Sequence, residues 1–576
     1  MALLLIIEAV AALAVARVLT RWFQRKLAYY RCPGTSIENI PGPPSKSFWI
    51  GNFKDLFRPD AWDFHRDIAQ TYGGVVRLTG PLGTQRSQLY VYDPKALHHI
   101  VVKEQHVYEE ALNFIQGNLT VFGPGLLSTL GDHHRRQRKM LNPVFSIAHM
   151  RGMVPIFWEV ASKVRATFQR KVANGPVEIE MHHWITRTAL ELIGQSGLGW
   201  TFDTLTEDEH TTHPFHVALK SFGATIQRLL FWRIYIYPLV YWIGTPKFQR
   251  RLVDWLPWKD LHDLRNMTDV LHNTSVEIFE TKKKALLQGE EAMAKEVGRG
   301  KDIISVLMAA NMNASEEDRL PDEEVLGQIS TFTFAAADTT SGALLRILWL
   351  LCKHRDVQSK LREEIREARK NNRYLDYDEL ASLPYLDAVC RETLRLYVDD
   401  DPSHVPDDGK KLMCYIHSYP PVSTLMRECR ADSVLPLSKP VRGLDGSEMT
   451  EVLVPKDTRI YLSIFSCNRS PELWGPDVFE WKPDRWLSPL PESLTQAKIP
   501  GIYSHLMTFL GGGRACIGFK FSQLEMKVVL CELLEHFEFS LPKDKEITWR
   551  MPGIAKPYVT TDGKSPQLPL IVSPVE

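Results

Sequence analysis

The chain lacks an excess of charge of either sign and lacks any close pair of cysteines. Its 576 residues include 69 basic and 69 acidic side chains, so the formal net charge at pH 7 is zero. This neutral, evenly mixed pattern argues against a nucleic-acid partner and is typical of solvated helix faces. The eight cysteines are scattered and form no CxxC pair, so neither a disulfide framework nor a zinc site is predicted.

The chain also lacks internal repeats, a long Gly/Ser linker and any change of composition between residues 40 and 576. Length alone suggests several domains. Without a boundary signal, one large catalytic domain over residues 46–576 is the simpler interpretation. With 44% hydrophobic residues, the chain can bury a large core. No GxGxxG motif occurs in a nucleotide-binding context, so no flavin or nicotinamide domain is predicted.

The first 20 residues are mostly apolar, interrupted by Glu8 and Arg17. Basic residues follow this run and none precedes it, which favours a membrane anchor over residues 1–22 with the rest of the chain in the cytosol. An interfacial helix and a cleaved signal peptide are the alternatives. Residues 23–45 form a basic linker that ends in the stiff sequence IPGPP.

A glycine-rich loop, FLGGGRACIG, covers residues 509–518 and precedes an amphipathic run. Apolar residues at helical spacing follow it, so Cys516 is predicted at or near a helix N-terminus. There the helix dipole and free N–H groups favour a thiolate over a thiol. Glycines allow the loop backbone to lie close to a flat ligand. The alternative is a buried structural cysteine beside a phosphate-type glycine loop.

Phe, Gly, Arg, Cys and Gly stand at every position of the pattern FxxGxRxCxG, so the chain resembles the cytochrome P450 family. The resemblance implies a mainly α fold with small β-sheets and a b-type haem. Cys516 would be the axial iron ligand, Arg514 would pair with a haem propionate, and Phe509 would line the haem. A thiolate ligand donates electron density to haem iron and favours O–O cleavage.

A long helix is predicted from about Pro321 to Lys353, with three acids in its first turn. It is apolar on nearly all sides, so it should be buried; a transmembrane span is the alternative. Its centre contains Asp338 and Thr339, which resemble the acid and alcohol of the family's oxygen-activating stretch. Thr339 would hold a water network and Asp338 would link it to solvent. Ala336 stands where the family often has glycine, and its methyl group could narrow the oxygen groove.

Three further groups of residues match the family in chain order. Glu392 and Arg395 lie one helical turn apart, and the resemblance joins them to Arg485 in a buried ion network behind the haem. Residues 131–139 resemble a helix near a haem propionate, with His134 in place of the usual tryptophan and with Arg138. A basic surface helix is the alternative. A further propionate candidate, Arg427, follows a Pro-Pro-Val sequence.

One segment, residues 397–418, does not fit the family. Its removal restores the continuous sequence ETLRLYPPV. The hypothesis is a retained intron, because residues 396–398 can be encoded with the splice donor GTATGT and Ser418 with the acceptor AG. The alternative is a surface loop, although a long structureless loop beside the haem network is unusual.

The resemblance implies a monooxygenase that takes electrons from NADPH through a separate NADPH–cytochrome P450 reductase, with cytochrome b5 as an optional second partner. It implies a lipophilic substrate that enters from the membrane. The anchor suggests the endoplasmic reticulum, and the intron suggests a fungal source and secondary metabolism. A peroxygenase or isomerase and a non-catalytic haem sensor are the competing hypotheses.

Overall fold

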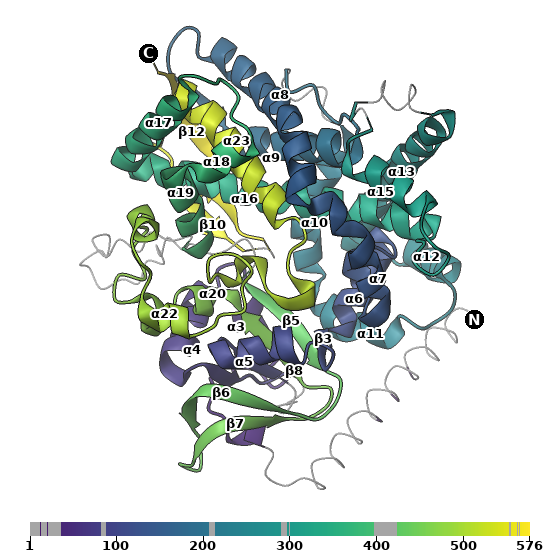
Figure 1. Ribbon diagram of the computed structural model, residues 1–576. Helices are drawn as coiled ribbons and strands as arrows, with labels where there is room; N and C mark the ends of the chain where they lie inside the picture. The colour runs from purple at the N-terminus through teal and green to yellow at the C-terminus, as the bar shows by residue number, and fades with distance from the viewer. Residues whose placement is uncertain are drawn as a thin grey trace.

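A computed structural model describes residues 36–575 except 82–87, 207–212, 290–296, 299, 397–422, 552–553, 562 and 564, and it describes residues 12, 16 and 20 singly. Most of this part is helical, and small separate sheets complete it (Figure 1). The mainly α fold with small sheets is therefore confirmed. The predicted anchor, most of the linker and the 397–418 segment lie outside the described residues.

The helices account for most of the core. They are α2 (Ser36–Asn39), α3 (Phe53–Phe57), α4 (Trp62–Tyr72), α5 (Pro94–His98), α6 (Leu112–Phe122), α7 (Gly131–Leu141), α8 (Ile147–Lys171), α9 (Met181–Leu192), α10 (Pro214–Arg228), α11 (Tyr237–Val240), α12 (Pro246–Trp255), α13 (Lys259–Gln288), α15 (Ile303–Met312), α16 (Asp322–Lys353), α17 (Arg355–Arg369), α18 (Tyr377–Ser382), α19 (Pro384–Arg395), α20 (Ile464–Asn468), α21 (Pro471–Trp474), α22 (Glu492–Gln496) and α23 (Phe519–His536).

The strands form four sheets in the order β1-β2-β8-β5-β3, β4-β12-β9, β10-β11 and β6-β7. They are β1 (Val75–Arg77), β2 (Gln88–Val91), β3 (Tyr108–Glu110), β4 (Val177–Glu180), β5 (Thr424–Cys429), β6 (Ser433–Arg442), β7 (Glu448–Val454), β8 (Arg459–Ser463), β9 (Phe537–Ser540), β10 (Ile547–Arg550), β11 (Lys556–Val559) and β12 (Pro569–Pro574). In the five-stranded sheet, Glu110 of β3 lies opposite Arg427 of β5.

Helix α16 is the central element, and it begins and ends close to its predicted bounds. Pro321 is its N-cap, and three acids in its first turn oppose the positive end of the helix dipole. It packs against α9, α13 and α23. Among the described residues it is the one helix long and apolar enough to cross a membrane, but 78% of its most apolar window is buried inside the protein. It is therefore the core helix that the sequence predicts.

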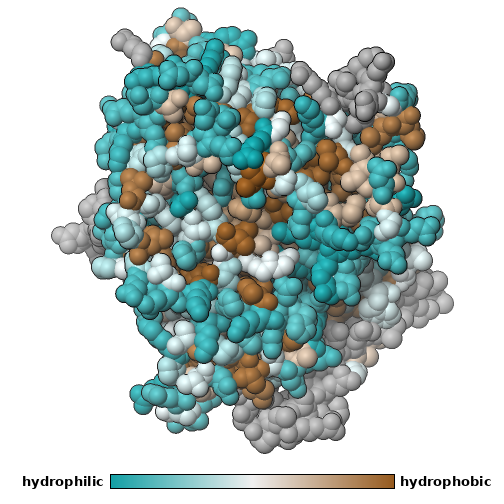
Figure 2. Space-filling view, in the orientation of Figure 1, coloured by the Kyte–Doolittle hydropathy of each residue, from teal (hydrophilic) through white to brown (hydrophobic). Residues whose placement is uncertain are grey.

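Several of the exposed large apolar side chains lie near α12 in the sequence. Trp232, Trp242, Phe248 and Trp255 all have more than a third of their surface exposed. On the face shown in Figure 2, apolar side chains lie in separate patches among hydrophilic ones. Small separate patches are ordinary for a folded protein, whereas a cluster of aromatic side chains suggests an interaction surface.

Candidate active site

The cysteine loop lies directly before α23, as the sequence predicts. The Cys516 N–H donates to the Phe509 carbonyl at 2.9 Å, which closes the loop. The ring of Phe509 is buried and lies 6.1 Å from that of Phe519. Cys516 is exposed, whereas the other free cysteines of the described residues are buried. Burial by the surrounding protein nevertheless raises the pKa of the Cys516 thiol, so this exposed sulfur faces a space within the fold.

Two groups near the sulfur act against the effect of burial. The Gly518 N–H and the charge of Arg138 both lower the pKa of Cys516. A thiol that coordinates a metal cation is deprotonated outright. The loop therefore offers a thiolate ligand to a metal, and the donors that stabilise its negative charge are already in place.

Glycines in the loop permit contacts that no side chain would allow. A Cβ on Gly511 would lie 1.6 Å from the Pro500 carbonyl oxygen, and one on Gly512 would lie 1.7 Å from that of Val101. Gly512 also has a positive φ of 65°. The Gly513 N–H donates to the Gln105 side chain at 2.7 Å. The back of the loop is thus held tightly against the protein.

The four residues predicted to bind propionates come together beside the cysteine loop. Arg138 donates to the Ala515 carbonyl at 2.6 Å, Arg514 to the Thr129 carbonyl at 2.7 Å, and Arg427 to Glu110 at 2.6 Å.

Their mutual influence is visible in their pKa values. Burial lowers the pKa of Arg514 to about 10, with Arg427 and Arg138 lowering it further while Glu110 opposes them. Burial lowers the pKa of His134 to about 3, with help from Arg514 and Arg138. Three buried or partly buried guanidinium groups beside one loop favour the binding of an anion, although Arg427 already pairs with Glu110 at 2.6 Å.

A strip of accessible surface interrupts the otherwise buried helix α16. Between residues 327 and 352, only Phe334, Ala335, Ala336 and Thr339 are not buried. The Thr339 hydroxyl donates to the Ala335 carbonyl at 2.7 Å. Helix α16 packs on α23, which follows the cysteine loop, and the Thr340 hydroxyl, next to this strip, donates to Ser522 of α23 at 3.1 Å.

The strip begins at an apolar wall. The ring of Phe334 lies 4.7 Å from that of Phe122 on α6 and 5.1 Å from that of Phe222 on α10. Three aromatic side chains from separate helices thus meet at Phe334, one turn before the Asp338–Thr339 pair. Such a surface suits an apolar ligand. The sequence offered no signal for Phe222.

Asp338 pairs with a lysine that lies far away in the sequence. Its carboxylate is buried and accepts a 2.9 Å hydrogen bond from the Lys556 ammonium, which is also buried. The carboxylate therefore does not reach solvent directly, and the predicted link from the Thr339 water network to solvent through Asp338 stays a prediction. Lys556 lies 218 residues away on β11, so no local pattern could have revealed it.

The predicted ion network behind the loop is assembled. Arg395 donates to both oxygens of Glu392, at 2.9 and 2.7 Å, and the Arg485 Nε lies 3.5 Å from the same carboxylate. Trp486, which sequence reasoning passed over, donates to Glu392 at 2.9 Å. The Thr508 hydroxyl donates to the Leu394 carbonyl at 2.7 Å and so ties this network to the start of the cysteine loop.

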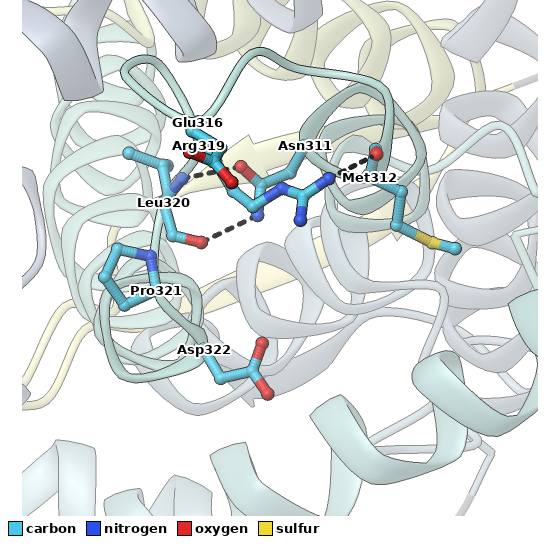
Figure 3. A pocket seen from close by; sticks show the side chains of 7 residues that line it. All are labelled: Asn311, Met312, Glu316, Arg319, Leu320, Pro321 and Asp322. Atoms are coloured by element: carbon cyan, nitrogen blue, oxygen red, sulfur yellow. Dashed lines mark hydrogen bonds between the residues drawn. The ribbon is translucent and has the colours of Figure 1, made fainter.

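A separate surface hollow lies where α15 ends and α16 begins (Figure 3). Its polar groups already serve one another, since Asn311 both donates to and accepts from the backbone of Leu320, at 2.8 and 2.7 Å. Arg319 donates to the Met312 carbonyl. These contacts close a loop, and the described residues near it hold no cluster of metal-ligating side chains. The site at Cys516 is therefore the better candidate for chemistry.

The Cys516 thiol, the neighbouring cations and the apolar wall fit a flat, iron-containing macrocycle with two carboxylates. The family model for cytochrome P450 matches residues 41–398 and 421–561. The chain belongs to the cytochrome P450 family, and it is a cytochrome P450 monooxygenase.

Similar proteins come from several fungi. Cytochrome P450 monooxygenase 91 of Postia placenta is 47% identical over 96% of this chain and 97% of its own length. A ganoderic acid synthetase of Ganoderma lucidum is 43% identical over 93% of this chain and 94% of its own length. A monooxygenase of Hericium erinaceus is 36% identical over 98% of both chains.

Proposed function

We propose that this chain inserts one atom of dioxygen into a lipophilic organic substrate at a b-type haem held by Cys516. The balanced reaction is RH + O2 + NADPH + H+ giving ROH + H2O + NADP+. The observation that carries the proposal is the exposed Cys516 thiol, which faces a space within the fold beside a cluster of buried cations. When bound, a haem with a thiolate ligand activates dioxygen for cleavage of the O–O bond.

One group of residues serves to bind and orient the haem. Arg138, Arg427 and Arg514 bind the propionates through charge-assisted hydrogen bonds, with His134 as a neutral neighbour. Phe509 packs under the loop. These residues bind and orient the macrocycle, and none of them transfers a proton.

Proton delivery falls to α16. The Thr339 hydroxyl faces the accessible strip and can hold a water molecule near the reacting atoms. The adjacent Asp338 carboxylate supplies that hydroxyl or its water with protons, because it lies behind Thr339 and is kept in place by Lys556. Ala336 adds a methyl group to the same strip and narrows the space there.

A lipophilic substrate is supported by the aromatic wall of Phe122, Phe222 and Phe334. A role in fungal secondary metabolism is supported by one relative, which is named a ganoderic acid synthetase. The electrons come from an NADPH–cytochrome P450 reductase, with cytochrome b5 as a second donor, because the sequence carries no nucleotide-binding motif.

We also propose that the protein is held at the endoplasmic reticulum membrane by a single N-terminal anchor, with the catalytic domain in the cytosol. Support comes from the apolar residues 1–22, the basic residues after them and the exposed aromatic side chains around α12. Flotation with lipid vesicles tests this proposal: loss of flotation on removal of residues 1–22 is the expected result, and unchanged binding would contradict the anchor.

The carbon monoxide difference spectrum of the reduced protein tests the haem assignment. The expected result is a Soret band of the thiolate type that disappears in Cys516→Ala. Cys467→Ala is the matched control, because Cys467 is a buried free cysteine on α20. A thiolate-type band that survives in Cys516→Ala would overturn the assignment.

A further inference from the structure

The buried ion pair of Asp338 and Lys556 has polar neighbours that the haem site does not use. Lys556 is the first residue of β11, and Asp338 is in the middle of α16. Their side chains are 7% and 6% exposed, so water does not reach the pair freely. Among the described contacts, only Oδ2 of Asp338 receives a hydrogen bond, which leaves Oδ1 for a water molecule or Thr339.

His182 lies near the start of α9, close to β11. Its N–H and the Leu568 N–H both donate to the Glu180 carboxylate, at 3.0 and 2.7 Å. The Gln567 N–H donates in turn to the carbonyl of Pro557, the residue after Lys556, at 2.9 Å. His182 of α9 is buried, and the charges of Lys556 and Lys220, together with His216, act on it. His216 of α10 is buried as well, and its ring lies 5.9 Å from that of His183. Lys220 and His183 are partly exposed. These lysine and histidine side chains therefore form a row from the surface of α10 towards Asp338.

Several ring nitrogens of these histidines can form further hydrogen bonds. Nδ1 of His182 and both ring nitrogens of His216 are buried without a hydrogen-bond partner among the described residues. Buried polar atoms of native proteins nearly always have a partner, and ordered water supplies it where no side chain does. These three nitrogens therefore mark positions for water between the two helices.

We propose that Lys556 and His182 form the inner end of a proton path to Asp338, which continues through His216 to the partly exposed Lys220 and His183. The inference rests on the proposed monooxygenase function, which consumes protons behind α16.

After each proton has been transferred along the path, every side chain has the protonation state with which it began. A proton from solvent enters a water chain, a neutral imidazole accepts it at one nitrogen and releases one from the other, and Asp338 takes up a proton and passes it towards Thr339. Burial and the charge of Lys556 lower the pKa of His182 well below its usual value, so this ring rests in the neutral form that such relays need. Lys556 is a positioning residue: its ammonium donates to the Asp338 carboxylate and holds it in place.

The test uses the full chain with its haem, in four variants: Lys556→Met, Lys556→Arg, His182→Leu and Asp338→Asn. The matched control is Lys527→Met. Lys527 is also a buried lysine, 6% exposed, and it joins α23 to α19 by binding Asp387 at 2.8 Å. Its loss removes the same kind of ion pair, and neither Lys527 nor Asp387 belongs to the proposed path.

The first readout is independent of turnover. Infrared difference spectra against Asp338→Asn isolate the Asp338 carboxyl. Lys556→Met is expected to shift the Asp338 carboxyl band, because the carboxyl group loses the hydrogen bond from Lys556, whereas Lys556→Arg should keep the band near its wild-type position. The control Lys527→Met should match the wild type.

The second readout is NADPH oxidation with purified NADPH–cytochrome P450 reductase in H2O and in D2O. Lys556→Met and His182→Leu are expected to slow it at least about tenfold with a larger solvent isotope effect, since positioned proton donors contribute that much or more. Lys556→Arg should restore most of the rate. Wild-type rates and isotope effects in both variants, each with an intact carbon monoxide spectrum, would overturn the path. A wild-type chain without a thiolate-type spectrum would instead overturn the proposed function.

Discussion

Arg395 donates two hydrogen bonds to the carboxylate of Glu392, one helical turn before it, and neither side chain has any exposed surface. The pair is surrounded by further donors and acceptors, so neither charge lacks a partner. Through the carbonyl of Leu394, the same turn of α19 receives Thr508 from the start of the cysteine loop. A change in this pair must therefore reach the haem site as well as the fold.

Replacing Glu392 with Gln should destabilise the protein by about 3–5 kcal/mol, because the buried Arg395 charge loses its counter-ion. The exposed pair Arg151–Asp378 supplies the control, and Arg151→Gln should cost at most about 1 kcal/mol. Denaturant unfolding of the two variants measures both effects. Equal stability losses would show that the buried network has no special role.

Replacing Gly512 with Ala should abolish haem retention or folding, since the new Cβ would lie 1.7 Å from a backbone oxygen and the residue has a positive φ. Gly152 on α8 has open space around its Cβ position, so Gly152→Ala should be neutral or slightly stabilising. Haem absorbance per protein and the melting temperature check both variants. A haem-loaded Gly512→Ala protein would contradict the tight packing of the loop.

Replacing Arg514 with Gln should weaken haem retention without destabilising the haem-free protein. The reason is that Arg514 shares a buried region with Arg138 and Arg427, which lower its pKa, and its removal relieves this repulsion. Haem transfer to apomyoglobin measures retention, and thermal unfolding of the haem-free form measures stability. Unchanged retention would remove Arg514 from the propionate site.

Replacing Glu525 with Gln should make stability less sensitive to pH. Burial raises the pKa of Glu525 well above 4.5, and its carboxyl oxygens are buried without a partner among the described residues. A group with a raised folded-state pKa contributes its full stability below the unfolded value of 4.5, and this is lost as pH rises through the folded value.

Melting temperatures measured over about two pH units on either side of neutrality check this prediction. The wild type should lose stability towards high pH more steeply than Glu525→Gln does. Glu532 is the contrasting control: it is equally buried but pairs with Arg369 at 2.9 Å, so Glu532→Gln should be destabilising. Parallel curves for the wild type and Glu525→Gln would contradict the prediction.

Deleting residues 397–418 should raise the yield of haem-loaded protein. The family model leaves residues 399–420 unmatched, which overlaps the segment predicted to be a retained intron. The deletion rejoins α19 directly to the segment that leads into β5 and its Arg427. Carbon monoxide spectra of both forms make the comparison, and sequencing of full-length transcripts tests the intron. If every transcript contains the segment and only the long form binds haem, the hypothesis is wrong.

Local sequence was sufficient for the parts of the site that lie close together along the chain. The cysteine loop is ten consecutive residues, and Glu392 and Arg395 are three apart on one helix. Helix α16 could be predicted as a buried element because its apolar residues cover nearly every side. Arg427 and His134 became site candidates only through the family resemblance, since an isolated Arg or His has no distinctive local pattern.

The sequence by itself determined the class of chemistry, because the Cys516 loop holds its ligand, its glycines and its neighbouring Arg514 in one short segment. Only the tertiary structure decided which distant side chains surround the residues of α16. Lys556 meets Asp338 across 218 residues, and Phe222 meets Phe334 from a different helix. Such contacts depend on how helices and strands pack, and many different residues at those distant positions would leave the local patterns unchanged.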